Sequence, residues 1–154
     1  MIERLSNSPA ETIKIAEKVA QRIREGSVIA LIGELGAGKT LFVQTIARTL
    51  GVESNVTSPT FNLMNVYEGI CPIVHFDLYR LQNEEDLDEI GFYEYVESEE
   101  GIVLIEWADR FPDALPENYI LITFEKLNST GRKIIFDAVG EEHEDFLEEL
   151  NDIL

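Results

Sequence analysis

The stretch "GELGAGKT", residues 33–40, combines residue types and a spacing that suit phosphate binding. It fits the pattern G-x-x-x-x-G-K-[ST], with Gly33, Gly38, Lys39 and Thr40 at the fixed positions. In such a loop, glycines let backbone N–H groups turn towards phosphate oxygens, and the following helix adds the positive end of its dipole. Lys39 would then reach the β- and γ-phosphates, while the Thr40 hydroxyl would bind Mg²⁺. The candidate nucleotide-binding residues here are Gly33, Glu34, Leu35, Gly36, Ala37, Gly38, Lys39, Thr40 and Leu41.

Two acidic residues are candidates to complete a magnesium site. Mg²⁺ usually needs a carboxylate at the end of a neighbouring buried strand as well as the loop hydroxyl. Asp77 ends the run "PIVHFD", and Glu106 ends the run "GIVLIE". We expect Asp77 to bind Mg²⁺ and Glu106 to orient the attacking water, although the sequence is also compatible with the reverse assignment. The predicted catalytic residues are therefore Lys39, Asp77 and Glu106, and the predicted metal ligands are Thr40, Asp77 and Glu106.

The segment "TSPTF" carries hydroxyl groups that could respond to the nucleotide. Thr57, Ser58 and Thr60 could contact Mg²⁺ or the γ-phosphate and so form a switch. The alternative interpretation is a proline-centred turn capped by hydroxyl groups. Two further residues could be structural or functional. His75 is expected to be a packed strand residue, and Trp107 is either a core residue or a stacking partner for a ligand ring.

Nucleotide identity and turnover rate are indicated by what the sequence lacks. It contains no [NT]-K-x-D element, which normally accompanies guanine specificity, so adenine is favoured by elimination. Arg80, Arg110 and Arg132 are the only arginines after residue 48, and none lies in a recognisable finger loop. Without a cation at the γ-phosphate, we expect slow turnover by the chain alone, with a partner completing the site.

The pattern of apolar residues predicts the elements that position these groups. A helix is expected over residues 9–25, followed by a buried strand in "SVIALIG" and a helix in "KTLFVQTIARTLG". Strand, glycine-rich loop and helix in this order are the context that a phosphate loop requires. Further along, we expect a hairpin of "FNLMNVYE" and "PIVHFDLYR", an acidic helical segment over 83–101, a strand in "GIVLIEW", a second hairpin of "NYILITFEK" and "RKIIFDAV", and an acidic helix at about 141–154.

These elements predict a single α/β domain over residues 1–154, with the P-loop NTPase fold and a mixed parallel and antiparallel sheet flanked by helices. The single cysteine excludes an internal disulfide and suits a reducing compartment. No apolar run is long enough to span a membrane, and no secretory signal is visible. We therefore expect a cytoplasmic protein without membrane association.

The charge of the chain is concentrated in its second half. Residues 1–80 contain eight Lys or Arg and eight Asp or Glu, whereas residues 81–154 contain four and twenty-two, which accounts for the net charge of -18. Nucleic acid favours a basic face, so this balance argues against tight, independent binding to tRNA or DNA. It suits either a solvated acidic face or docking onto a basic patch of another protein.

Taken together, five segments resemble one family. "ETIKIAEKVA", "GELGAGKT", "TSPTF", "HFDLYR" and "IEW", spread over residues 11–107, resemble TsaE (formerly YjeE), the small bacterial ATPases of tRNA threonylcarbamoyladenosine synthesis. The phosphate loop alone is generic. "SPTF" followed by H-x-D-x-Y-R and E-W is far more specific.

The resemblance implies ATP and Mg²⁺ as cofactors, "TSPTF" as a switch, Asp77 as the Walker-B acid, and functional roles for Glu106 and Trp107. It also implies that Thr12 lies near the nucleotide. In that family, the protein binds a complex of the catalytic subunit TsaD and its paralogue TsaB, and meets tRNA only through that complex. Its ATP hydrolysis supports repeated rounds of modification of the adenosine next to the anticodon.

Other functions fit part of the pattern. A nucleoside or sugar kinase would share the phosphate loop, but such kinases usually carry an arginine-bearing lid, and the residues after Arg80 are acidic. A nucleotide-gated adaptor would bind ATP and a partner without hydrolysis. A structural domain with an accidental motif would bind no nucleotide.

Overall fold

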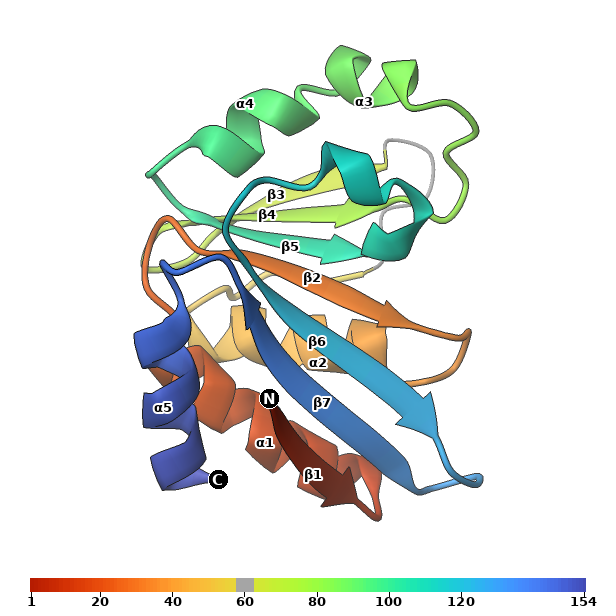
Figure 1. The fold of residues 1–154 in the computed structure, drawn as a ribbon, viewed down its shortest axis with the longest axis vertical. Helices are drawn as coiled ribbons and strands as arrows, with labels where there is room; N and C mark the ends of the chain where they lie inside the picture. The colour runs from red at the N-terminus through yellow and green to blue at the C-terminus, as the bar shows by residue number, and fades with distance from the viewer. Residues whose placement is uncertain (58–62) are drawn as a thin grey trace.

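The computed structural model describes residues 1–57 and 63–154. Within these residues, seven strands form one sheet in the order β1-β7-β6-β2-β5-β4-β3 (Figure 1). The strands are β1 (Ile2–Ser6), β2 (Val28–Gly33), β3 (Met64–Glu68), β4 (Pro72–Asp77), β5 (Ile102–Glu106), β6 (Tyr119–Lys126) and β7 (Arg132–Val139). The four central strands β6, β2, β5 and β4 run parallel, while β7, β1 and β3 pair antiparallel with their neighbours. The predicted mixed sheet and both predicted hairpins are confirmed.

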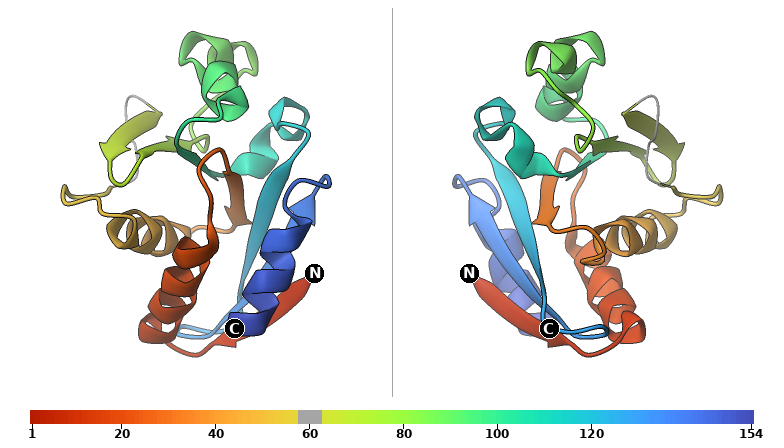
Figure 2. Two further views of the ribbon diagram at one scale, coloured as in Figure 1. Left: turned by 90° about the vertical axis from the view of Figure 1, so that its left-hand side faces the viewer. Right: turned by 90° about the vertical axis from the view of Figure 1, so that its right-hand side faces the viewer.

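Helices lie on both faces of this sheet (Figure 2). They are α1 (Pro9–Arg22), α2 (Lys39–Thr49), α3 (Glu85–Glu89), α4 (Phe92–Glu97) and α5 (Glu144–Ile153), with single 3₁₀ turns η1 (Ala108–Arg110) and η2 (Pro112–Ala114). Strand β2 shows the two layers directly, because alternate residues point to opposite faces. Ile29 and Leu31 pack with α1, α2 and α5, whereas Val28 and Ala30 pack with α3, α4 and η1. The continuously apolar run in the sequence therefore forms a strand buried on both sides, as predicted.

Some elements differ from the sequence-based expectations. The first helix begins as predicted, with the Ser8 side chain accepting from the Glu11 N–H, but ends at Arg22 because Ile23 adopts an extended conformation. The acidic segment forms two short helices instead of one, since Gly91 takes a left-handed conformation (φ 76°) between them. Strand β1 was not predicted. It pairs with β7, more than a hundred residues away, and a short edge strand leaves little periodicity in the sequence.

Helix α2 is fixed to the sheet by a cluster of aromatic rings. Phe42 is fully buried, and its ring centroid lies 5.3 Å from that of Phe124 on β6 and 6.4 Å from that of Phe136 on β7. Because Phe42 follows Lys39 and Thr40 by less than one helical turn, this packing also fixes the start of the helix against the end of the sheet.

We expect Phe42→Ala to lower the free energy of unfolding by about 3–5 kcal/mol, because it removes a buried ring and leaves a cavity. Urea denaturation followed by circular dichroism measures this change. Leu127→Ala is the control: this side chain is 54% exposed, so a change within about 0.5 kcal/mol is expected. Similar values for the two variants would contradict the aromatic cluster as the anchor of α2.

Candidate functional site

The glycine-rich loop connects the end of β2 to the start of α2, at the edge where the parallel strands end (Figure 1). Gly36 (φ 77°) and Gly38 (φ 106°) have left-handed backbone conformations. A Cβ atom added to either would meet no atom within 4 Å, so glycine is required there by backbone conformation and not by lack of space. The predicted strand, loop and helix context is confirmed.

Lys39 is held by the backbone of its own loop. Its side chain is 5% exposed, and Nζ donates to the carbonyl oxygens of Gly33 and of Glu34, the latter at 3.1 Å. Nζ also lies 4.0 Å from the ring centroid of Trp107, a cation–π contact. Burial lowers the pKa of Lys39, and the nearby carboxylates, Glu106 foremost, oppose this effect. The ammonium group is therefore placed at the loop before any phosphate arrives.

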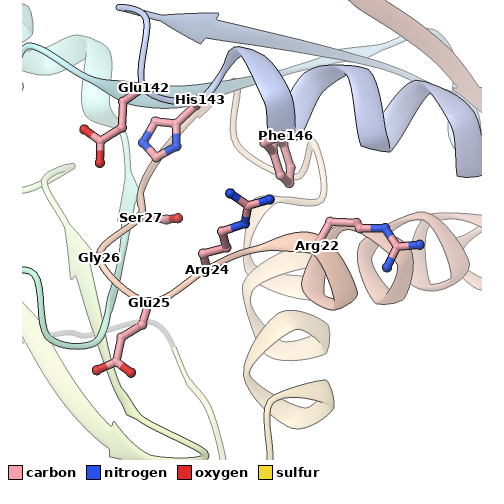
Figure 3. Close-up of a pocket in the computed structure, with 8 residues that line it drawn as sticks. All are labelled: Arg22, Arg24, Glu25, Gly26, Ser27, Glu142, His143 and Phe146. Carbon is pink, nitrogen blue, oxygen red and sulfur yellow. The ribbon is translucent and has the colours of Figure 1, made fainter.

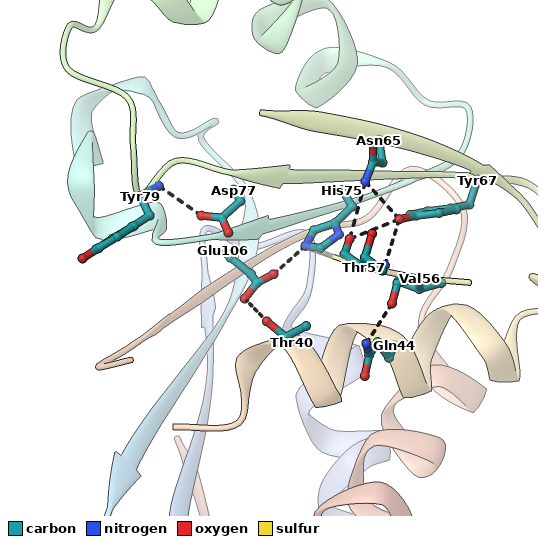
Figure 4. A network of polar contacts seen from close by, with 10 residues as sticks. All are labelled: Thr40, Gln44, Val56, Thr57, Asn65, Tyr67, His75, Asp77, Tyr79 and Glu106. Atoms are coloured by element: carbon teal, nitrogen blue, oxygen red, sulfur yellow. Dashed lines mark hydrogen bonds and ion pairs between the residues drawn. The ribbon is translucent and has the colours of Figure 1, made fainter. Parts of the chain in front are cut away.

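The two predicted carboxylates lie side by side. Asp77 on β4 and Glu106 on β5 are register partners in adjacent parallel strands, so both emerge at the same edge of the sheet. Glu106 is only 2% exposed, and its Oε1 accepts from the Thr40 hydroxyl at 3.0 Å (Figure 4). One Asp77 oxygen accepts from the Tyr79 N–H, also at 3.0 Å. The structure thus joins Thr40, the predicted magnesium-binding hydroxyl, directly to Glu106.

A buried histidine holds the other oxygen of Glu106. His75 is fully buried on β4, and its Nε2 lies 2.6 Å from Glu106 Oε2 (Figure 4). This contact is a buried hydrogen bond between an imidazole nitrogen and a carboxylate oxygen. His75 Nδ1 has no hydrogen-bond partner among the described residues. His75 is packed, as the sequence suggested, but it also orients a site residue.

A pocket brings most of the predicted residues together. Its lining comprises Leu35, Gly36, Ala37, Gly38, Lys39, Thr40, Leu41, Asp77, Tyr79, Glu106 and Trp107. Gly33 and Glu34 are not in the lining and contribute carbonyl oxygens to Lys39 instead. Sequence reasoning missed Tyr79, whose ring centroid lies 4.7 Å from that of Trp107. Its position two residues after Asp77, in the H-x-D-x-Y-R segment, was the available signal.

Trp107 lines this pocket from a strained backbone. Its φ angle of 58° is left-handed, which is rare for a bulky residue and costs about 1–3 kcal/mol. The conformation turns the chain sharply after β5 and into η1, so that the indole ring covers the Lys39 ammonium. Trp107 is thus a pocket residue and not a member of the fully buried core.

Other predicted residues lie elsewhere. Thr12 is 3% exposed on α1, where its hydroxyl contacts the Ser6 hydroxyl at 2.7 Å, and it does not line this pocket. A role for Thr12 at the nucleotide stays a prediction. Thr57 has its backbone N–H and C=O bonded to the Tyr67 hydroxyl, which ties it to β3 (Figure 4). Ser58 and Thr60 lie outside the described residues, so the switch also stays a prediction.

The donor set fits a magnesium nucleotide. Among the described residues, no group of three or more His, Cys, Asp or Glu side chains converges on a metal position. Mg²⁺ does not require such a cage, since it keeps several waters and binds one or two carboxylates together with substrate phosphates. The Thr40 hydroxyl beside Glu106 and Asp77 meets that requirement. Left-handed glycines before α2 would supply the backbone cradle for the phosphates.

A second pocket lies at the opposite end of β2 (Figure 3). Two of its charged residues already have partners in the protein: Arg24 pairs with Glu149 at 3.0 Å, and Glu25 accepts from the Gly101 N–H at 3.0 Å. Burial lowers the pKa of His143 there, and Glu142 opposes this effect. This pocket has neither the loop nor the paired carboxylates, so the candidate site is the one at the glycine-rich loop.

In the part of the chain that the structure describes, no helix combines the length and apolar character needed to span a bilayer.

The sheet, the loop between β2 and α2, and the carboxylates at the ends of β4 and β5 define a P-loop nucleotide-binding fold. Comparison with known proteins supports this class and narrows it. The family described as "Threonylcarbamoyl adenosine biosynthesis protein TsaE" matches residues 6–134. The chain belongs to the TsaE family.

Similar proteins cover nearly the whole chain. The tRNA threonylcarbamoyladenosine biosynthesis protein TsaE of Bacillus subtilis (strain 168) is 37% identical over 145 residues, covering 94% of this chain and 90% of that protein. The protein of the same name from Treponema pallidum is 40% identical over 130 residues, covering 84% and 96%. A crystal structure of Bacillus subtilis YdiB superposes with a TM-score of 0.83 at 33% identity, covering 99% of this chain and 95% of that one.

We expect His75→Ala to lower the free energy of unfolding by about 2–4 kcal/mol, because it opens a cavity and removes the hydrogen bond between Nε2 and a buried carboxylate oxygen. Chemical denaturation measures the loss. The only other histidine, His143, provides the matched control, and about 1 kcal/mol is expected for His143→Ala. An equal loss in the two variants would mean that the contact with Glu106 contributes nothing beyond packing.

Proposed function

We propose that this chain is a Mg²⁺-dependent ATPase that supports tRNA threonylcarbamoyladenosine synthesis. The observation that carries the proposal is the contact between Thr40 and the buried Glu106 beside Lys39, in a chain of the TsaE family. When bound, Mg²⁺·ATP supplies a phosphoanhydride bond that water can cleave. Family membership favours this function over that of a small-molecule kinase.

Each residue of the site has a proposed part in the reaction. Loop N–H groups and Lys39 bind the phosphates and neutralise charge on them. The Thr40–Glu106 contact favours Glu106 as the carboxylate nearest Mg²⁺, with His75 holding it in orientation. We propose that Asp77, which lies at the same edge and is less buried, orients the attacking water. This is the reverse of the assignment that the sequence first suggested.

Turnover by the chain alone is proposed to be slow. Among the described residues, no arginine lines the pocket, so these residues supply no guanidinium for charge that develops on the γ-phosphate. We infer that proteins of the TsaB and TsaD type complete the site in the cytoplasm, and that tRNA is met only through them. The net charge of -18 supports contact with a basic protein surface over direct contact with nucleic acid.

The same shortage of cations supports one alternative, a nucleotide-gated adaptor that binds ATP without hydrolysing it. ATP turnover of the purified chain, alone and with TsaB, TsaD and tRNA, separates the two functions. A slow basal rate that rises in the complex is expected for the ATPase. Bound ATP that is never cleaved under either condition would establish the adaptor.

We expect Lys39→Ala to weaken ATP binding by about 10- to 100-fold, because it removes a charge-assisted contact to phosphate. Isothermal titration calorimetry with ATP and Mg²⁺ measures this change, and circular dichroism checks that the variant folds. Lys18→Ala is the control, since Lys18 is exposed on α1 and outside the pocket. If Lys39→Ala bound ATP as tightly as the control does, the phosphate site would be assigned to the wrong loop.

The roles of the two acidic residues can be separated by magnesium titration. We expect Glu106→Gln to raise the Mg²⁺ concentration needed for half-maximal turnover on the order of 10-fold or more, because it removes the charge beside Thr40. Glutamine can still accept from Thr40, and circular dichroism checks that the variant folds. Asp77→Asn is expected to lower the rate with a smaller change in magnesium requirement. The opposite pattern would restore Asp77 as the main metal ligand.

A further inference from the structure

Arg132, the first residue of β7, donates hydrogen bonds to four backbone carbonyl oxygens. Two belong to the turn before it: Nη1 lies 2.9 Å from the oxygens of both Asn128 and Gly131. The other two belong to the phosphate loop: Nη2 lies 3.0 Å from the Gly36 oxygen, and Nε lies 3.1 Å from the Ala37 oxygen. One guanidinium group thus ties the β6–β7 turn to the glycine-rich loop.

The fold directs this side chain to the loop. Strand β7 pairs with β6, and β6 pairs with β2, so the β6–β7 turn extends beside the loop that follows β2 (Figure 1). Arg132 shares a strand face with Ile134 and Phe136, which are fully buried in the cluster that contains α1 and α2. Strand alternation therefore points the guanidinium at the face where the loop enters α2.

We propose that Arg132 is a positioning residue that holds the phosphate loop in its binding conformation from behind, without touching the nucleotide. Arg132 does not line the loop pocket, and its donors are engaged by carbonyl oxygens. It therefore does not act as an arginine finger. This inference rests on the proposed nucleotide-binding function, but the conformation of the loop can be measured without nucleotide.

Peptide geometry explains how the contact would act. The C=O and N–H of one peptide unit point in opposite directions, so a carbonyl fixed on Arg132 turns the next N–H away from it. For the Gly36 carbonyl, that N–H belongs to Ala37. It donates a hydrogen bond to the Glu34 carbonyl oxygen at 3.1 Å and so closes a turn. For the Ala37 carbonyl, that N–H belongs to Gly38, a residue of the pocket lining, and it is directed away from the guanidinium. The anchor thus sets the direction of an amide in the cradle.

Beside the contacts of Lys39 and the turn at Ala37, the two left-handed glycines of the loop have no packing of their own among the described residues. At Gly36 and Gly38, the position of a Cβ has no atom within 4 Å, so no side-chain packing restrains these flexible residues. Hydrogen bonds from a charged donor are stronger than neutral ones, and the planar guanidinium presents several donors in a fixed geometry. A lysine in place of Arg132 would keep the positive charge but would lack this planar set of donors.

Hydrogen exchange of the full chain without nucleotide tests the proposal. We expect amides of residues 34–40 to exchange about 10-fold faster in Arg132→Gln than in wild type, with little change in the rest of the sheet. Lys133→Gln is the matched control. Lys133 is the next residue on the same strand and points to the other face. Its Nζ lies 3.5 Å from Glu3 Oε2. Its loop amides are expected to exchange as in wild type.

The affinity for ATP provides the second measurement. We expect Arg132→Gln to bind ATP about 10-fold more weakly, Arg132→Lys to be intermediate, and Lys133→Gln to match wild type. Unchanged loop exchange and unchanged affinity in Arg132→Gln would overturn the proposal. If Arg132→Gln does not fold, the same two measurements are made on Arg132→Lys, and unchanged loop exchange with unchanged affinity in that variant would overturn the proposal. Wild-type protein that binds no ATP would instead refute the proposed function, while the exchange result would still test the anchor.

Discussion

The buried carboxylate of Glu106 is the constraint around which the site is arranged. A side chain that is 2% exposed cannot rely on water, so its charge must be met by donors inside the protein. The Thr40 hydroxyl meets one oxygen and His75 Nε2 meets the other. These contacts join α2, β4 and β5 at a single point. The phosphate loop, the Thr40 hydroxyl and the second acid at Asp77 are consequently held in fixed relation to each other.

The order of the strands makes this arrangement possible. Strand β2 lies between β6 and β5, so the loop that leaves it has a parallel neighbour on each side. The ends of β4 and β5 deliver the two acids on one side, and the β6–β7 turn delivers Arg132 on the other. On its pocket side, the loop therefore faces the two carboxylates and the rings of Tyr79 and Trp107. On the other side, the carbonyl oxygens of Gly36 and Ala37 accept hydrogen bonds from the Arg132 guanidinium. Both halves of the chain are needed to build one short loop.

The parts of this site that local sequence could predict are those encoded in a few consecutive residues. The pattern around Lys39, the apolar run of β2 and the turn-bounded hairpins belong to that group, and all three were found as predicted. The contacts that complete the site join distant residues instead. Thr40 and Glu106 are 66 residues apart, and Arg132 is 95 residues from Ala37. The spacing of apolar residues along the sequence does not indicate such long-range contacts. The contacts of His75 and Arg132 therefore depend on the strand order, which the sequence pattern does not give.

The position of Trp107 has a practical consequence. It is the only tryptophan in the sequence, and its ring lies against the Lys39 ammonium and the Tyr79 ring. Indole emission depends on the polarity and charge around the ring, and all of that emission comes from this one pocket. The protein therefore carries its own optical label at the phosphate loop, which reports on the loop without any added dye or engineered residue.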